Sequence, residues 1–263
     1  MEERIQLEEY MRRRAAGGIC VAFSGGVDSA VVLKAACGAG GVIHAVTGYT
    51  PFHSPLEPVE ARRMAQGMGA RFHLVQPPLP PELLQNPANR CYLCKKALFT
   101  HFWNLAREQG LGSLLDGTNT DDRGVYRPGL RALGELGVGS PLAELGFSKA
   151  QVRRLAGEMG LEAARKPSAP CLATRFPYGT PINLELLPRV DELERYVRSL
   201  GPQIVRARIH GGSVRLEVPA ADFLTVLASG REITAKAREL GFLYTALDLL
   251  GFRSGSMDEA LEV

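Results

Sequence analysis

The chain contains 263 residues, which is enough for one large domain or two modest ones. Apolar residues make up 45% of it, and no run reaches the ~20 apolar residues that a membrane span requires. The first residues, MEERIQLEEYMRRR, lack the apolar core of a signal peptide, so we expect a cytoplasmic protein with no membrane partner. The 31 basic residues nearly balance the 28 acidic ones, and no basic stripe indicates a nucleic-acid partner.

Short apolar runs alternate with amphipathic stretches through the first two thirds of the chain. The predicted strands are 19–23, 42–47, 72–75 and 114–116, and the predicted helices between them are 29–37, 59–68 and 95–109. This alternation predicts an α/β fold, with a parallel sheet covered by helices on both faces. Ser148, followed by Gln151, forms a capping-box pattern that opens a further helix, which we expect to stop at Gly160.

The proline-rich segment 165–181 carries four prolines and no periodic pattern of apolar residues. It separates two regions whose predicted secondary structure differs. We therefore predict one domain at 1–175 and a smaller C-terminal domain at 176–263. The elements predicted beyond the boundary are a helix at 184–200, a hairpin of 203–209 and 213–218, two more helices and a strand near 242–247. These elements indicate an α+β unit.

The strongest local motif is Ser24-Gly25-Gly26-Val27-Asp28-Ser29, which follows the first predicted strand and opens a helix. Two glycines let the backbone turn tightly, so that successive amides and the helix N-terminus point at one anion. The two serine hydroxyls suit phosphate oxygens, and the Asp28 carboxylate suits a magnesium ion beside them. The motif lacks the Gly-Lys-Ser/Thr ending of a Walker A loop, which predicts a different class of phosphate site.

The motif resembles the PP-loop, SGGxDS, of the ATP pyrophosphatase superfamily. This resemblance implies a Rossmann-like parallel sheet, the use of ATP with Mg²⁺, and cleavage of ATP between its α and β phosphates. It also implies that Thr47, in the VTGY segment at the end of the second strand, lies beside the adenine; the alternative is a plain strand end.

Further segments narrow the resemblance to one family. They are NRCYLCKK at 89–96, DGTNTDDR at 116–123, YRPG at 126–129, KPSAPCLATR at 166–175, PYG at 177–179 and LGFRSGS at 250–256. In this order, together with SGGVDS, they resemble the LarE family of ATP-dependent sacrificial sulfur transferases over residues 17 to 258. The ATP-binding set that follows is Ser24, Gly25, Gly26, Val27, Asp28, Ser29, Thr47, Gly117 and Arg123.

The family resemblance also implies the reaction. The substrate would be pyridinium-3,5-biscarboxylic acid mononucleotide, made from nicotinic acid adenine dinucleotide. Its carboxylates would be adenylated and then converted to thiocarboxylates, for the nickel-pincer cofactor of lactate racemase. The resemblance further implies a homo-oligomer.

The five cysteines fall into two groups. Cys20 and Cys37 lie in apolar runs and are interpreted as small buried hydrophobic residues. Cys91, Cys94 and Cys171 lie in polar settings, and a cytoplasmic chain is not expected to join them in disulfides.

The three polar cysteines match the members of the family that hold a [4Fe–4S] cluster, and sulfide or a sulfur donor would then be a partner. The resemblance makes Cys171 and Asp28 catalytic residues and Cys91, Cys94 and Cys171 metal ligands. Two alternatives stay open: a structural zinc ion with His101 or His73 as fourth ligand, and a metal-free Cys171 that gives up its own sulfur and becomes dehydroalanine.

An anionic substrate requires arginines held in fixed orientation. Strand alternation places Arg206 and Arg208 on one face of the predicted hairpin, which could also be a solvated face. Arg206, Arg208 and Arg253 match the positions that bind the substrate phosphate in the family. Lys95 and Arg175 flank the cysteines and are assigned to the adenylate or the substrate carboxylates.

Two acidic residues and the function of the whole chain each allow more than one interpretation of the sequence. Asp121 and Asp122 are interpreted either as ligands of magnesium or ribose or as residues that cap a turn. The chain as a whole could be a tRNA thiolase of the PP-loop and three-cysteine type, an amide-forming ligase, or a catalytically idle iron–sulfur scaffold or nucleotide sensor.

Overall fold

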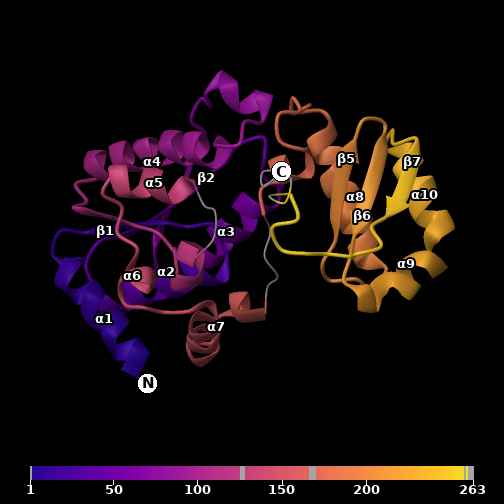
Figure 1. Cartoon of the computed structure of the whole chain (residues 1–263). Helices are drawn as coiled ribbons and strands as arrows, with labels where there is room; N and C mark the ends of the chain where they lie inside the picture. Colours follow the sequence, from indigo (N-terminus) through magenta and orange to yellow (C-terminus); the bar gives the residue numbers. More distant parts are fainter. Residues whose placement is uncertain (1, 125–127, 166–169, 258, 260–263) are drawn as a thin grey trace. The chain divides into compact units, whose positions relative to one another are not determined.

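The computed structural model describes residues 2–124, 128–165, 170–257 and 259. The chain forms two compact units (Figure 1). The first consists of Met1–Thr50, Pro55–Pro80 and Asn89–Ser168, and the second of Pro51–Ser54, Pro81–Ala88 and Ala169–Val263. The second unit therefore begins near the expected boundary, but it also contains two short pieces from earlier in the chain. The functional division at residue 175 stays a prediction.

The first unit contains a parallel sheet of four strands, β1 (Ile19–Ala22), β2 (Ile43–Gly48), β3 (Arg71–Val75) and β4 (Ser113–Leu115). Their order in the sheet is β3-β2-β1-β4, and each neighbouring pair is parallel. The predicted α/β fold with a Rossmann-like sheet is confirmed. The carboxyl ends of all four strands therefore lie at one edge, where ligands bind in sheets of this kind.

Helices cover both faces of this sheet. They are α1 (Glu2–Ala15), α2 (Val27–Ala39), α3 (Glu57–Gly67), α4 (Arg90–Glu108), α5 (Gly129–Glu135), α6 (Pro141–Glu144) and α7 (Lys149–Glu158). In Figure 1, α4 and α5 lie on one side of the sheet and α1, α2 and α7 on the other. Ile19 and Val21 of β1 pack into the core formed with α1, α2 and α7, whereas Cys20 packs into the core formed with α4 and α5. Within the described residues, no helix is long and apolar enough to cross a membrane.

The capping box predicted for α7 is present. The Ser148 hydroxyl accepts a hydrogen bond from the Gln151 amide, and the Ser148 amide donates to Gln151 Oε1 at 2.9 Å. Gly160 adopts a φ of 68° after the helix, a conformation that glycine tolerates better than other residues. The cap makes Lys149 the first residue of the helix.

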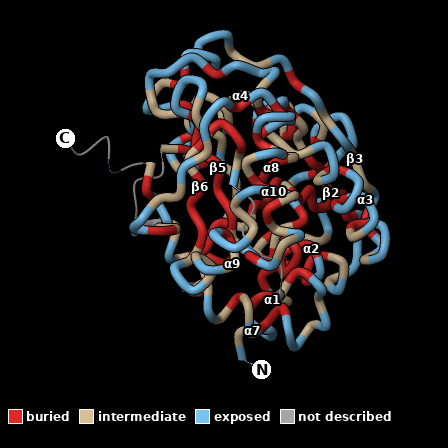
Figure 2. Tube along the Cα trace, turned by 90° about the vertical axis from the view of Figure 1, so that its right-hand side faces the viewer, coloured by how far each residue is buried: buried red, intermediate tan, exposed pale blue. Residues whose placement is uncertain are grey.

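The second unit contains α8 (Leu186–Ser199), β5 (Arg206–His210), β6 (Ser213–Glu217), α9 (Phe223–Ala228), α10 (Gly230–Glu239) and β7 (Tyr244–Leu247). β5 and β6 form the predicted antiparallel hairpin, and Gly211 supplies the positive φ, 59°, that its turn needs. β7 returns parallel to β6 after the two helices. Figure 2 shows that β5 and β6 are buried along most of their length.

The two inserted pieces hold the proline-rich segment in place. The Leu172 amide donates to the Phe52 carbonyl at 2.8 Å. Asn86 is fully buried with a φ of 52°, and its side-chain amide donates to the carbonyls of Phe176 at 3.1 Å and Pro177 at 2.7 Å. The segment that was expected to be a loop is therefore fixed by backbone and side-chain hydrogen bonds from distant parts of the sequence.

Candidate functional site

Residues 24–29, here called the SGGVDS loop, follow β1 and include the first three residues of α2. Gly25 has a φ of 74°, which allows the tight turn. The two serine hydroxyls lie 3.3 Å apart, and the Gly26 amide donates to Ser24 Oγ at 3.3 Å. In the described structure no side chain caps the start of α2 at Gly26. Amides of its first turn can therefore face an anion, as predicted.

The ends of β4 and β2 meet this loop. A Cβ atom on Gly117 would lie 2.7 Å from the Ser29 nitrogen, so only glycine permits this approach of the two backbones. The Thr47 hydroxyl donates to the carbonyl of Phe23, the residue that precedes the loop. The structure therefore brings Thr47 and Gly117 beside the SGGVDS loop. The side chain of Arg123, the remaining predicted ATP ligand, lies outside the described residues.

The segment after β4 uses its acidic residues to fix the backbone. Asp122 accepts a hydrogen bond from the Asn119 amide at 3.1 Å, and Asp121 accepts one from the Lys149 amide at 3.0 Å. These contacts support the interpretation of both residues as caps of a turn and of a helix N-terminus. The Asn119 side chain in turn donates to Asp28 Oδ1 at 3.3 Å, and so links the segment to the SGGVDS loop.

Lys149 is a contact of the loop that the sequence did not reveal. Its ammonium group forms an ion pair with Asp28 Oδ2. The two residues are 121 positions apart in the chain, and no local sequence pattern predicts that they pair. Only the capping box gave a hint, because it predicted that α7 begins at this residue.

The two cysteines of the CxxC motif lie in the first turn of α4, three residues apart and so on one face. Cys91 is exposed and Cys94 half-buried. Cys171 belongs to the second unit, where it precedes the short helix η4 (Leu172–Arg175), and it is also half-buried. Among the residues that the structure describes, no group of three or more His, Cys, Asp and Glu side chains is arranged to hold a metal ion.

The other cysteines and the candidate zinc ligands have different surroundings. Cys20 is buried as predicted, and burial raises the pKa of its thiol to about 12. Cys37 is only partly buried. His73 Nε2 lies 3.1 Å from Nδ1 of His44, and His101 Nδ1 lies 2.9 Å from the carbonyl of the preceding turn of α4. Both candidate zinc ligands thus already hold a hydrogen bond with one ring nitrogen.

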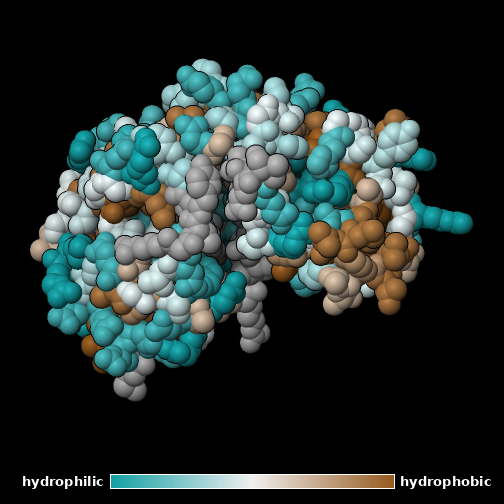
Figure 3. Space-filling view, in the orientation of Figure 1, coloured by the Kyte–Doolittle hydropathy of each residue, from teal (hydrophilic) through white to brown (hydrophobic). Residues whose placement is uncertain are grey.

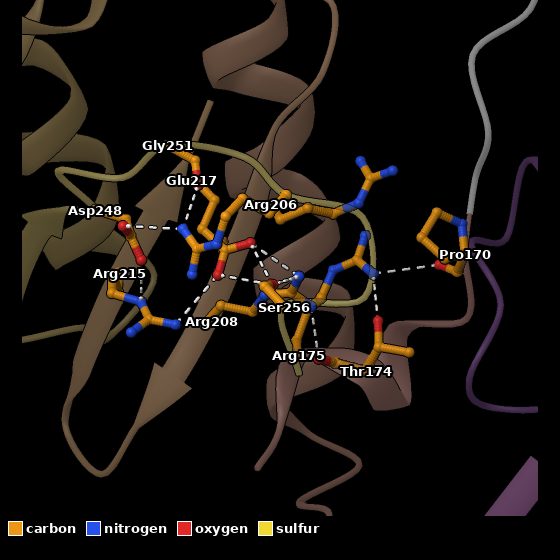
Figure 4. Close-up of polar contacts among 12 residues, drawn as sticks. Pro170, Thr174, Arg175, Arg206, Arg208, Arg215, Glu217, Asp248, Gly251 and Ser256 are labelled. Carbon is orange, nitrogen blue, oxygen red and sulfur yellow. Dashed lines mark hydrogen bonds and ion pairs between the residues drawn. The ribbon is translucent and has the colours of Figure 1, made fainter. Parts of the chain in front are cut away.

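The arginines of β5 are buried, so the alternative of a solvated strand face is wrong. Arg206 is 7% and Arg208 is 5% exposed. Arg208 donates to Glu217 Oε2 at 2.8 Å, to Ser256 Oγ at 3.0 Å and to the Thr174 carbonyl at 2.7 Å (Figure 4). Alternation along the strand predicted a common face for the two arginines, but it could not predict that other segments cover that face.

Glu194 of α8 anchors Arg175, which was predicted to bind an anion. Arg175 donates to both Glu194 oxygens, at 2.7 and 2.9 Å, and the Ala207 amide donates to the same carboxylate at 2.8 Å. Burial alone would raise the pKa of Glu194, but the charges and hydrogen bonds of Arg175, the Ala207 amide and the charge of Arg206 lower it below the ordinary carboxyl value. Glu194 is therefore a buried, ionised partner.

The buried cluster as a whole is rich in positive charge. The arginine cluster, as we call it, contains Arg175, Arg198, Arg206, Arg208 and Arg215 around the carboxylates of Glu194, Glu217 and Asp248. Burial, and then the positive charge of Arg175, lower the pKa of Arg206 to about 10. An anion placed beside Arg206 would offset this repulsion. The cluster therefore has the electrostatic properties of an anion-binding site.

The remaining predicted substrate ligands lie in more open places. Arg253 is about one third exposed and pairs with Glu259 at 3.0 Å and Asp248 at 3.7 Å. Lys95 lies on α4 of the first unit, and its aliphatic stem packs against Gly129, where a Cβ atom would come within 2.7 Å of it. Sequence reasoning missed Glu194 and Ser256, because nothing in their local pattern marks them as partners of the arginines.

The parallel sheet and the SGGVDS loop at its carboxyl edge define a PP-loop domain of the ATP pyrophosphatase type. No family model matches the chain. It is 35% identical, over 92% of its length and 90% of the relative's, to pyridinium-3,5-bisthiocarboxylic acid mononucleotide synthase of Lactiplantibacillus plantarum. The chain therefore belongs to the LarE family of sulfurtransferases, and this membership implies the use of ATP.

Two further relatives are uncharacterized proteins. One, from Synechocystis, is 40% identical over 92% of both chains. The other, from Methanocaldococcus jannaschii, is 31% identical over 66% of this chain and 68% of its own length. The first of these matches covers 92% of the chain and therefore extends over both structural units.

The arginine cluster generates a prediction about stability. We expect Glu194→Gln to lower the free energy of unfolding by about 3–5 kcal/mol, because it leaves a buried guanidinium without its counterion. The folded-state pKa of Glu194 is lowered, so the difference between wild type and variant should be complete above about pH 5 and shrink as the pH falls below about 4. Urea unfolding at several pH values measures it.

Glu192→Gln is the matched control, because Glu192 lies on the same helix and pairs with Lys236 at the surface. It should leave the free energy of unfolding nearly unchanged. Equal effects of the two substitutions would contradict the view that Glu194 is the buried anchor of the cluster.

Proposed function

We propose that this chain is an ATP-dependent sulfurtransferase that converts the carboxylates of pyridinium-3,5-biscarboxylic acid mononucleotide to thiocarboxylates, for the biosynthesis of a nickel-pincer cofactor. The observation that carries the proposal is the similarity, along both units, to a synthase of the bisthiocarboxylic acid mononucleotide. A carboxylate oxygen would bond to the α-phosphorus of ATP, and pyrophosphate would leave. Sulfur would then attack the acyl-adenylate, and AMP would leave.

The SGGVDS loop is the proposed site of the ATP phosphates, with Thr47 and Gly117 beside it and Arg123 as a further ligand. The proposal includes a magnesium ion. The Asp28 carboxylate has the oxygen ligands that this ion prefers, and its side chain is about one quarter exposed and therefore accessible. Bound magnesium would offset the phosphate charge, and Asp28 would hold it against the loop.

The arginine cluster is the proposed site of the substrate's anionic groups. Arg206 and Arg208 would bind its phosphate, with Arg253 nearby in the same unit, while Arg175 and Lys95 would serve the carboxylates or the adenylate. Support comes from the burial and the excess positive charge of the cluster, which favour a multiply charged anion.

A direct test replaces Arg206 or Arg208 by alanine. Each change should weaken binding of the dicarboxylate mononucleotide by ~1.5–3 kcal/mol, the contribution of a hydrogen bond to a charged group. Titration calorimetry measures this, unchanged ATP affinity shows that the first unit is intact, and unchanged far-UV circular dichroism shows that the second unit is folded. Arg195→Ala, at an exposed position of α8, is the control. Normal substrate affinity in both cluster variants would leave the arginines with a purely structural role.

The proposed sulfur site consists of Cys91, Cys94 and Cys171. Three thiolates suit a [4Fe–4S] cluster, which would keep one iron without a protein ligand and could hold an exogenous sulfide there. The exposed and half-buried positions of these residues are consistent with such a role, whereas the buried Cys20 is not. Sulfide or another sulfur donor would then be the partner that replaces the sulfur used in each turnover.

The sulfur source is decided by replacing each cysteine with alanine. After anaerobic reconstitution, we expect the wild type to contain iron and sulfide, and Cys91→Ala, Cys94→Ala and Cys171→Ala to lose both, together with repeated turnover. Cys37→Ala, at a partly buried position of α2, should change neither. Iron and sulfide analysis with intact-protein mass spectrometry provides the readout. Dehydroalanine at residue 171 after a single turnover would instead identify Cys171 as the sacrificed sulfur donor.

We also propose that the chain forms a homo-oligomer through an apolar surface of the second unit. Figure 3 shows hydrophobic side chains gathered around α9. The apolar surface consists of Leu224 and Leu227 of α9 together with Leu249 and Leu250 after β7, which are 63–85% exposed. It adjoins β7, an edge strand of its sheet, and a second copy of the same surface is the partner that covers both.

Sedimentation measures this association. We expect an oligomeric wild type, a shift toward monomer for Leu224→Asp and Leu249→Asp, and no shift for the control Val59→Asp, an exposed position of α3 in the first unit. A monomeric wild type would contradict the proposal.

A further inference from the structure

The SGGVDS loop contains no basic residue, although the triphosphate of ATP carries about four negative charges at neutral pH. A Walker A loop meets this charge with a lysine of its own. In the SGGVDS loop, backbone amides and two hydroxyls face the anion, and its charged residue, Asp28, is acidic. A cation must therefore come from another part of the chain or from bound metal.

Lys149 is the basic side chain that the described contacts place on this loop. Its ammonium group forms an ion pair with Asp28, and its side chain is 31% exposed, so a ligand can reach it. The position of the lysine is fixed from two sides. The capping box of Ser148 sets the start of α7, and the Lys149 amide donates to Asp121 Oδ2 at 3.0 Å.

A purely structural surface ion pair does not require this much support. Such a pair by itself contributes little to stability. Here both ends are fixed, because Asn119 donates to the other oxygen of Asp28 at 3.3 Å. The arrangement keeps an ammonium group on Asp28, in the first turn of α2 and next to Ser29 in the chain, where a phosphate is expected.

We propose that Lys149 binds the pyrophosphate portion of ATP and takes the place of the lysine that a Walker A loop carries. The inference rests on the proposed use of ATP at the SGGVDS loop. Asp28 holds the ammonium group before ATP arrives, and one of its three N–H donors then contacts a β- or γ-phosphate oxygen. Negative charge grows on the leaving pyrophosphate as the bond to the α-phosphorus breaks, and Lys149 stabilises it there.

The rival explanation is that Lys149 only positions Asp28. The two roles differ in which phosphates they affect. A lysine that contacts the pyrophosphate portion affects ATP and free pyrophosphate but not AMP. A lysine that only positions Asp28 and the loop affects AMP as much as ATP, affects neither nucleotide, or affects ATP and pyrophosphate only when the magnesium ion proposed at Asp28 is present.

The experiment titrates ATP, pyrophosphate and AMP into the full-length chain by calorimetry, once with magnesium and once with EDTA. In both conditions we expect Lys149→Met to weaken ATP and pyrophosphate binding about 10- to 100-fold and to change AMP binding by less than about twofold. Lys149→Arg, which keeps the charge, should recover part of the loss. Lys34→Met, at an exposed position of α2, is the matched control and should bind all three like the wild type.

The outcomes separate the inference from the function on which it rests. A wild type that binds no ATP would overturn both. A wild type that binds ATP, with a Lys149→Met variant that binds it equally well, loses AMP in parallel, or loses ATP only when magnesium is present, would overturn the role of Lys149 alone. Thermal unfolding of each variant checks the fold, and Lys149→Gln replaces the methionine variant if that variant does not fold.

Discussion

The ion pair between Arg175 and Glu194 is the contact on which the second unit depends. The same guanidinium that binds Glu194 also donates to Thr174 Oγ1 at 2.7 Å and reaches the carbonyls of Pro170 at 3.3 Å and Cys171 at 3.4 Å. Because Glu194 also accepts from the amide of Ala207, one carboxylate connects the turn that carries the cysteine to α8 and β5. The position of the proposed sulfur ligand is therefore set by a buried charge and not by the local turn alone.

Buried charges of this kind are costly unless each has a partner, and the cluster satisfies them unevenly. Glu194 and Glu217 each accept from more than one donor, whereas the arginines outnumber the carboxylates. Among the described residues Arg208 Nε is buried without a hydrogen-bond partner. An anion beside Arg206 would offset the burial and repulsion that lower the pKa of this arginine. The same imbalance in the packing of the second unit supports the anion-binding role proposed for the cluster.

Regular features of the fold could be predicted because each depends on a short stretch of sequence. The alternation of strands and helices, the cap at Ser148 and the glycines of the SGGVDS loop are local, and the structure agrees with all of them. The burial of Arg206 and Arg208 could not be predicted in this way. A strand face that carries arginines looks solvated from its sequence, and it is covered here by segments near Thr174 and Ser256. The pairing of Lys149 with Asp28 joins elements 121 positions apart and left no local pattern.

Both units prepare their cations in the same manner. Lys149 is held by Asp28, Arg175 by Glu194 and Arg208 by Glu217, so each basic group is oriented by a carboxylate before any ligand is present. A cation held in this way loses little side-chain entropy when an anion arrives, and its pairing limits the cost of removing it from water. Each carboxylate lowers the positive electrostatic potential at the position of an anion. In the second unit the arginines outnumber the carboxylates, so the potential there stays positive. In the first unit the helix N-terminus of α2 provides additional positive potential beside Lys149, and the proposed magnesium ion would add to it.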